Sequence, residues 1–310
     1  MKNPLVTGNE AKDIDDAVGR VLAEFKGYEP PLDLHRVIDH LKLDLEYYST
    51  KNLTGFREMV HKLKVGTKQI VQRPMLLVDA IRSLELRALY LPDAKKILVD
   101  RDLHKLQYRW AEGHEIGHSI IWWHKDYLMG DSDQELSPAC HAVIEAEANY
   151  ACGRLIFFQD RFVKDTMSLP VCMESVVTLH KRYGNTLKST FWRFIESHRG
   201  SKAIVGMITG HPHLTDSNFD PVKPCKYTIQ SPLFRQKFSG TTELQLFSAI
   251  RSYCPRWKKR GPMGSGEVAL CDSNGDKHEF VFESFQTAYD LFSIGRETTK
   301  ETSRTVRVIA

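Results

Sequence analysis

The stretch from Trp110 to His124, WAEGHEIGHSIIWWH, decides the interpretation of this chain, and its centre is His114-Glu-Ile-Gly-His118. Apolar residues recur at helical spacing through the stretch, so we predict a helix that begins after Asp102. Residues four positions apart lie on one face of a helix. The two histidines can therefore bind one metal ion, and Glu115 beside them can reach a metal-bound water.

A catalytic zinc site takes three protein ligands and leaves one position for water, so a third ligand must come from elsewhere. His124 is the near candidate, because its distance from His118 matches the spacing of the metzincins. The metzincin pattern has a glycine three residues after its second histidine, where the chain turns sharply before the third. This chain has Ile121 there, a β-branched residue poorly suited to a positive φ. We therefore favour a ligand further along the chain.

The far candidate is Glu145, which lies on a second predicted helix that opens at Ser137-Pro138 and runs to about Phe158. A carboxylate at this place can complete a His-His-Glu site. Asn149 follows one turn later on the same face, where its amide can hydrogen-bond one of the ligands. Glu147 is two positions from Glu145 and points to a different side of the helix.

The motif His114-Glu-Ile-Gly-His118, followed by Glu145-x-x-Ala-Asn149, resembles the ImmA/IrrE family of metallopeptidases. Members of that family cut helix-turn-helix repressors and so switch on the genes that those repressors silence. The resemblance implies that His114, His118 and Glu145 bind Zn2+ and that Glu115 is the catalytic carboxylate. It implies a zinc-dependent endopeptidase of restricted specificity, whose partner is a protein substrate, a helix-turn-helix repressor.

The resemblance covers about residues 11–200, with specific motifs only between residues 97 and 158. We expect an α+β fold with three parts. A zincin-like metallopeptidase domain at residues 1–165 packs helices on a small mixed or antiparallel sheet, and a helical, helix-turn-helix-like extension follows at 166–200. A small α/β domain occupies residues 215–310. Some family members carry a GAF-like sensor module at this end, and no motif here identifies a ligand.

Two features lie next to the metal motif. Residues 84–91 and 96–100 are typical of an antiparallel hairpin. Its second strand, at residues 97–100, leads directly into the metal-binding helix, and we expect an exposed edge there to hold a substrate peptide by main-chain hydrogen bonds. Gly113 and Gly117 lie one turn apart inside the first helix, where each costs about 1 kcal/mol relative to Ala. We therefore expect another backbone to approach that face of the helix closely.

The later part of the chain alternates helices and strands. The helices predicted at 171–181 and 187–198 could contact DNA, but the second exposes a mixed set of charges, so packing on the protein is favoured. Beyond a linker near residues 200–212, the patterns predict a helix at 242–253, a hairpin closed near Asn274-Gly275 and a further helix at 285–292.

The composition is that of a soluble globular protein: 310 residues, 42% hydrophobic and 26% charged, with a net charge of +4 that does not require a nucleic-acid partner. The first ten residues hold no apolar signal segment, and no later run is long enough to span a bilayer. The six cysteines form no C-x-x-C pair. We expect a cytoplasmic protein with reduced thiols and no membrane partner.

Two other functions fit the same residues. One is a metal-binding, peptidase-like module that sequesters a regulator without cleaving it. The other is a DNA-binding regulator that uses the helices between residues 171 and 199. Glu115 favours the enzyme, because a scaffold needs the metal ligands at most and has no use for a base.

Overall fold

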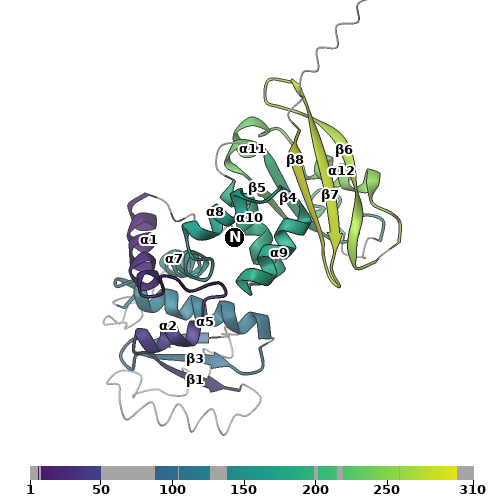
Figure 1. Cartoon of the computed structure of the whole chain (residues 1–310). Helices are drawn as coiled ribbons and strands as arrows, with labels where there is room; N and C mark the ends of the chain where they lie inside the picture. The colour runs from purple at the N-terminus through teal and green to yellow at the C-terminus, as the bar shows by residue number, and fades with distance from the viewer. Residues whose placement is uncertain are drawn as a thin grey trace, which may run out of the picture. The chain divides into compact units, whose positions relative to one another are not determined.

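The computed structural model describes residues 6, 8–49, 88–103, 105–125, 138–198, 202–214, 219–257 and 259–298. Helices and strands are mixed within these residues, and the fold is α+β, as predicted. The chain divides into two compact units, residues 1–162 with 182–186 and residues 163–181 with 187–310 (Figure 1). Most of the helical segment expected at residues 166–200 groups with the second unit.

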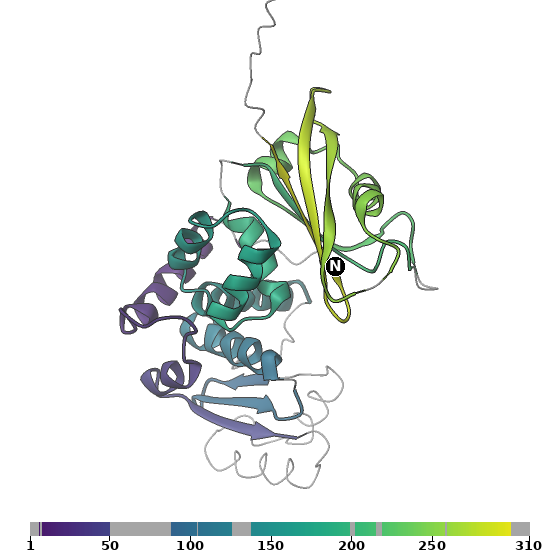
Figure 2. The same cartoon turned by 45° about the vertical axis from the view of Figure 1, so that its right-hand side comes forward.

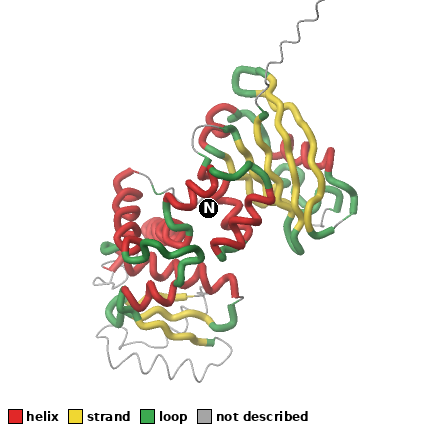
Figure 3. The backbone as a smooth tube through the Cα atoms, viewed as in Figure 1, coloured by secondary structure: helices red, strands yellow, loops and turns green. Residues whose placement is uncertain are grey.

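The first unit places one helix between a small sheet and a second helix (Figure 3). Its elements are α1 (Gly8–Ala23), α2 (Leu34–His40), β1 (Asp44–Tyr48), β2 (Ala88–Leu91), β3 (Lys96–Asp100), α5 (Lys105–Ile120) and α7 (Pro138–Ile156). The central strand β3 pairs in parallel with β1 and antiparallel with β2, so the sheet is mixed. The predicted hairpin is confirmed over residues 88–100, and residues 84–87 lie outside the described residues.

Burial explains why β3 is central and where α5 packs. Ile97, Leu98 and Val99 are fully buried in succession, as in a strand that is covered on both faces. The exposed edge expected at residues 97–100 is therefore wrong, because β3 pairs on both sides and β2 is an edge strand of the described sheet. α5 contacts β2 and β3 on one side and α7 on another. The helix begins at Lys105, later than the expected cap at Asp102, and it ends at Ile120.

The glycines of α5 allow α7 to lie close. A Cβ atom on Gly117 would stand 2.8 Å from the carbonyl oxygen of Ala148, which belongs to the backbone of α7. A Cβ atom on Gly113 would stand 2.9 Å from the Sγ atom of Cys152. The expected approach of another backbone is confirmed at Gly117, whereas a side chain fills the space at Gly113. This contact brings Glu145 of α7 within reach of the histidines of α5.

The second unit is an antiparallel sheet with helices on both faces (Figure 2). Its strands lie in the order β5-β4-β8-β7-β6. The elements from the end of the first unit onward are α8 (Asp160–Met167), α9 (Met173–Tyr183), α10 (Leu187–Ser197), β4 (Ile204–Thr209), β5 (Cys225–Gln230), α11 (Pro232–Lys237), α12 (Glu243–Tyr253), β6 (Gly261–Cys271), β7 (Lys277–Gln286) and β8 (Leu291–Glu297). The predicted helix at 242–253 and the hairpin near Asn274-Gly275 are confirmed.

Two predictions for this unit are wrong. The helix expected at 285–292 does not form: Phe285 lies in β7 and Phe292 in β8, and the two residues pair across the strands. Their spacing suits a helix as well as a hairpin, and the long-range pairing decides between the two. The linker expected near residue 206 contains strand β4, where Gly206 leaves room for Phe191 and Ile195 of α10.

α10 uses its apolar face to cover the sheet. Phe191, Phe194 and Ile195 are fully buried, and the helix packs on β4 and β5. This is the packing role that the mixed charges of the helix favour. Among the described helices, none is long and apolar enough to cross a membrane.

Candidate metal centre

Three side chains that the sequence singles out meet between α5 and α7. The Nε2 atoms of His114 and His118 lie 3.2 Å apart. Glu145 places one carboxylate oxygen 3.2 Å from Nε2 of His114 and the other 3.5 Å from Nε2 of His118. Tetrahedral metal bonds of about 2.0–2.1 Å put neighbouring donor atoms about 3.3 Å apart. The distance between the two nitrogens matches this value, and one donor atom from each of the three residues lies within 4.8 Å of the others, so the group could hold a metal ion.

The second nitrogen of each imidazole is also engaged. Nδ1 of His114 lies 3.2 Å from Oδ1 of Asn149, the residue expected to hydrogen-bond a ligand. An amide oxygen only accepts, so His114 donates through Nδ1 and turns the lone pair of Nε2 toward the other donors. Nδ1 of His118 lies 2.9 Å from Nδ1 of His124. Both imidazole rings are thus oriented by partners on the side away from Nε2.

Electrostatics within the group favour a bound cation. Burial lowers the pKa of His114, but the hydrogen bond to Glu145 and the charges of Glu115 and Glu145 outweigh burial and raise that pKa above 6.5. Burial raises the pKa of Glu145, yet the hydrogen bonds from His114 and His118 prevail and lower it far below 4.5. The Glu145 carboxylate therefore stays charged beside the two imidazole rings, and a charged carboxylate with two imidazoles attracts a metal ion.

Glu115 lies beside the three donors and is not one of them. Its side chain is only 5% exposed, and it accepts a hydrogen bond from the backbone N–H of Tyr90 on β2. Burial raises the pKa of Glu115, although His114 and His118 oppose this shift. A carboxyl group with raised proton affinity next to a metal site can accept a proton from water and release it again.

His124, the alternative third ligand, contacts the group without joining it. The ring is fully buried, and its Nε2 atom lies 2.7 Å from Oε2 of Glu147. Trp123 donates to the same oxygen over 2.7 Å. Burial and the charges of nearby histidines lower the pKa of His124 to about 3, so the ring is neutral near pH 7. Glu147 does point away from Glu145, as expected, but its partner His124 is not apparent from local sequence rules.

Nearness in sequence makes four residues candidates to stabilise an oxyanion, namely Tyr150, Arg154, His124 and Tyr127. The described ones have other partners. Tyr150 donates to Oδ2 of Asp15 over 3.3 Å, and Nε of Arg154 lies 2.5 Å from Oδ1 of the same residue on α1. His124 is held by His118 and Glu147. Tyr127, the fourth of these residues, lies outside the described residues. No donor for this role is therefore assigned among the residues that the structure describes.

The comparisons with known proteins concern the fold. No family model matches the chain, and no curated protein sequence matches it. Among solved structures, the chain is similar to one described as a Mycobacterium tuberculosis transcriptional regulator, with a TM-score of 0.50 and 14% sequence identity. The similarity covers 92% of this chain and 75% of that chain.

Proposed function

We propose that this chain is a zinc-dependent endopeptidase of the ImmA/IrrE type, with a zincin-like peptidase domain in its first part. The observation that carries the proposal is the His114-His118-Glu145 group, whose donor spacing suits a tetrahedral metal site. The buried Glu115 beside it adds a proton acceptor, which metal storage alone does not need.

The chemistry follows from the roles that these residues can take. Zn2+, when bound by His114, His118 and Glu145, acidifies water and polarises a carbonyl group. Glu115 takes a proton from the attacking water and passes it to the leaving amine. Asn149 holds the ring of His114 in the orientation that exposes Nε2. The products are a new carboxylate and a new amine at the cut peptide bond.

The substrate is proposed to be an extended segment of a regulatory protein, in particular a helix-turn-helix repressor. β2 is the edge strand next to α5 in the described sheet, and an edge strand can bind a peptide through main-chain hydrogen bonds. Its Tyr90 already donates to Glu115, which couples the edge to the proposed base. The repressor as substrate rests on the motif resemblance, and a neighbour in fold described as a transcriptional regulator fits such a role.

The test begins with the zinc content of purified wild type and of Glu145→Ala. We expect about one equivalent in the wild type and a loss of zinc in the variant, because two imidazoles alone bind zinc weakly. The wild type with zinc is then incubated with candidate repressors, and cleavage is followed by mass spectrometry. A wild type without zinc, or a Glu145→Ala protein that keeps it, overturns the site. Zinc binding without any cleavage favours the sequestering module instead.

A further inference from the structure

We propose that His124 and Glu147 are positioning residues that hold His118 in the form that binds the metal. This inference rests on the proposed metal centre, but it concerns residues that are not among its ligands. His124 follows the end of α5, and Glu147 lies on α7. The two residues are 0% and 5% exposed. His118 is hydrogen-bonded to His124, and His124 is hydrogen-bonded to Glu147.

The hydrogen bonds permit one arrangement of protons. The carboxylate of Glu147 only accepts, so the proton between it and His124 sits on Nε2 of His124. A neutral imidazole carries one proton, so a His124 ring that is protonated on Nε2 has its lone pair on Nδ1. Nδ1 of His124 therefore accepts, and Nδ1 of His118 donates to it over 2.9 Å.

This arrangement decides which nitrogen of His118 is available. A neutral imidazole that donates through Nδ1 carries its lone pair on Nε2, the atom that lies 3.2 Å from Nε2 of His114. Glu147 in turn is held by a second donor, Nε1 of Trp123, at 2.7 Å. The carboxylate thus fixes the ring of His124, and His124 fixes both the tautomer and the orientation of His118.

If His124 and Glu147 served only to pack the core, apolar side chains would be expected in their place. An imidazole and a carboxylate inside the core cost free energy to desolvate, and apolar side chains of similar size would fill the same space without that cost. The two ligands are also treated alike, since Asn149 plays for His114 the part that His124 plays for His118. The recurrence of an acceptor behind each ring points to metal binding and not to packing alone.

The test compares two substitutions of His124 in the full chain. His124→Asn keeps an acceptor oxygen near the place of Nδ1, whereas His124→Leu fills the space with no acceptor. Zinc affinity is measured by competition with a chromophoric chelator, and the visible spectrum of the Co2+ form reports ligand geometry. We expect His124→Leu to lose about 10–100-fold in affinity with an altered Co2+ spectrum, and His124→Asn to retain most of the affinity.

Two further variants complete the experiment. Glu147→Gln keeps an acceptor without the charge and should weaken zinc binding less than His124→Leu does. Tyr47→Phe removes a different hydrogen bond to a buried carboxylate on α5, that of Glu112, and should leave affinity unchanged. If His124→Leu fails to fold, the comparison of zinc affinity between Glu147→Gln and wild type decides, and Tyr47→Phe remains the control.

The outcomes separate this inference from the proposed function. Equal zinc affinity in wild type, His124→Leu and Glu147→Gln would overturn the positioning role while leaving the metal centre intact. Lower thermal stability of the metal-free variants with unchanged affinity would overturn it as well, since packing alone predicts that result. A wild type that binds no zinc overturns the metal centre itself, and the inference falls with it.

Discussion

At the scale of single residues, two carboxylates next to the same histidines experience opposite environments. Glu115 is buried and its pKa is raised, whereas Glu145 accepts hydrogen bonds from both rings and its pKa is lowered. Environments that push two pKa values apart commonly separate a proton-transfer group from a permanently charged one. These directions support the proposal that Glu145 binds the metal and that Glu115 transfers the proton.

The assignment predicts the behaviour of Glu115→Gln. The amide cannot take a proton from water, so the cleavage rate of a substrate repressor should fall by at least about 100-fold. Zinc content should be unchanged, because Glu115 is not one of the three donors. Single-turnover cleavage and metal analysis measure the two quantities on the same preparation. Loss of zinc from this variant would contradict the division of roles.

At the scale of elements, the contact between α5 and α7 sets the geometry of the metal group. Two of the candidate ligands come from α5 and one from α7, so the distances between them depend on how closely the helices approach. Gly117 meets the backbone of Ala148, which cannot move aside, while Gly113 meets the side chains of Cys152 and Ile156, which can. The two glycines should therefore respond differently to an added methyl group.

Gly117→Ala is expected to lower both stability and zinc affinity. Overpacking against a backbone atom costs about 1–3 kcal/mol, which exceeds the gain of about 1 kcal/mol from replacing a helical glycine. Gly113→Ala should be closer to neutral. Denaturant unfolding and chelator competition measure the effects, with Gly240→Ala as a control because no atom lies within 4 Å of its added Cβ. Equal effects at Gly113 and Gly117 would contradict the explanation.

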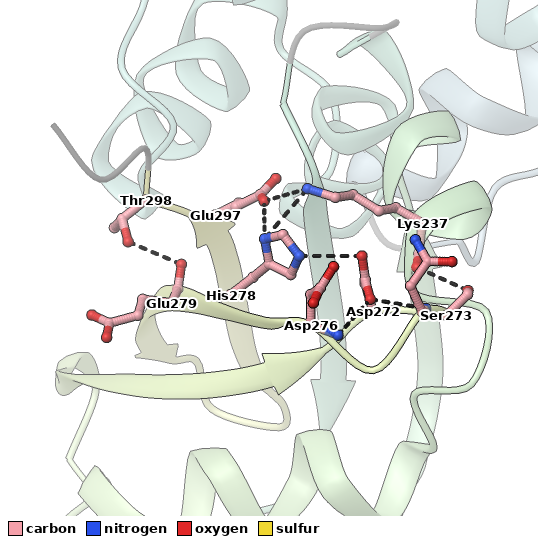
Figure 4. Close-up of polar contacts among 9 residues, drawn as sticks. Lys237, Asp272, Ser273, Asp276, His278, Glu279, Glu297 and Thr298 are labelled. Carbon is pink, nitrogen blue, oxygen red and sulfur yellow. Dashed lines mark hydrogen bonds and ion pairs between the residues drawn. The ribbon is translucent and has the colours of Figure 1, made fainter. Parts of the chain in front are cut away.

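A second element, the β6–β7 hairpin, is closed by a polar network (Figure 4). Oδ1 of Asp272 accepts from the backbone N–H groups of Asn274 and Asp276, each over 2.9 Å. His278 lies between Oδ2 of Asp272, at 3.3 Å, and Oε1 of Glu297, at 2.9 Å. Burial raises the pKa of Asp272, but these backbone N–H groups and His278 outweigh burial and lower it.

The lowered pKa predicts how the contribution of Asp272 depends on pH. A carboxylate with an ordinary pKa of 3.8 that is lowered by folding adds stability above about pH 3.8 and loses it as the pH falls through the lowered value. The unfolding temperatures of wild type and Asp272→Asn should therefore differ at pH 7. They should converge once the pH falls below the lowered pKa of Asp272. Asp276→Asn, in the same turn, is the control. A difference that stays constant with pH would count against this account.

At the scale of the whole molecule, the chain joins two compact units of different kinds. The candidate metal centre belongs entirely to the first unit, because its three residues lie on α5 and α7. The second unit is an antiparallel sheet with helices on both faces. A GAF-like sensor in the second unit remains a prediction. The division assigns the proposed chemistry to one unit and leaves the other available for a different task.

This division predicts a selective effect of zinc removal. A ligand that binds only the folded state stabilises it by about 2.7 kcal/mol at a free concentration of 100 times its Kd. Calorimetry with and without a chelator should therefore shift the transition of the first unit more than that of the second. In Glu145→Ala the chelator should have no effect. Equal shifts of both transitions would refute the selective stabilisation.

The sequence by itself determined the parts that depend on local geometry. Helical periodicity sufficed to place His114 with His118 and Glu145 with Asn149, because residues one turn apart share a face whatever the rest of the chain does. The capped helix α12 and the turn at Asn274-Gly275 follow from equally local rules. For the same reason, a backbone approach at Gly117 was predictable from its cost in a helix.

Only the tertiary structure decided the features that depend on distant partners. His124 pairs with Glu147 because the chain reverses after α5 and returns along α7, which local spacing does not encode. Strand β4 and the strand ends at Phe285 and Phe292 likewise depend on neighbours far away in sequence. The physical reason is that burial and strand pairing are properties of two segments together, so one segment alone cannot specify them.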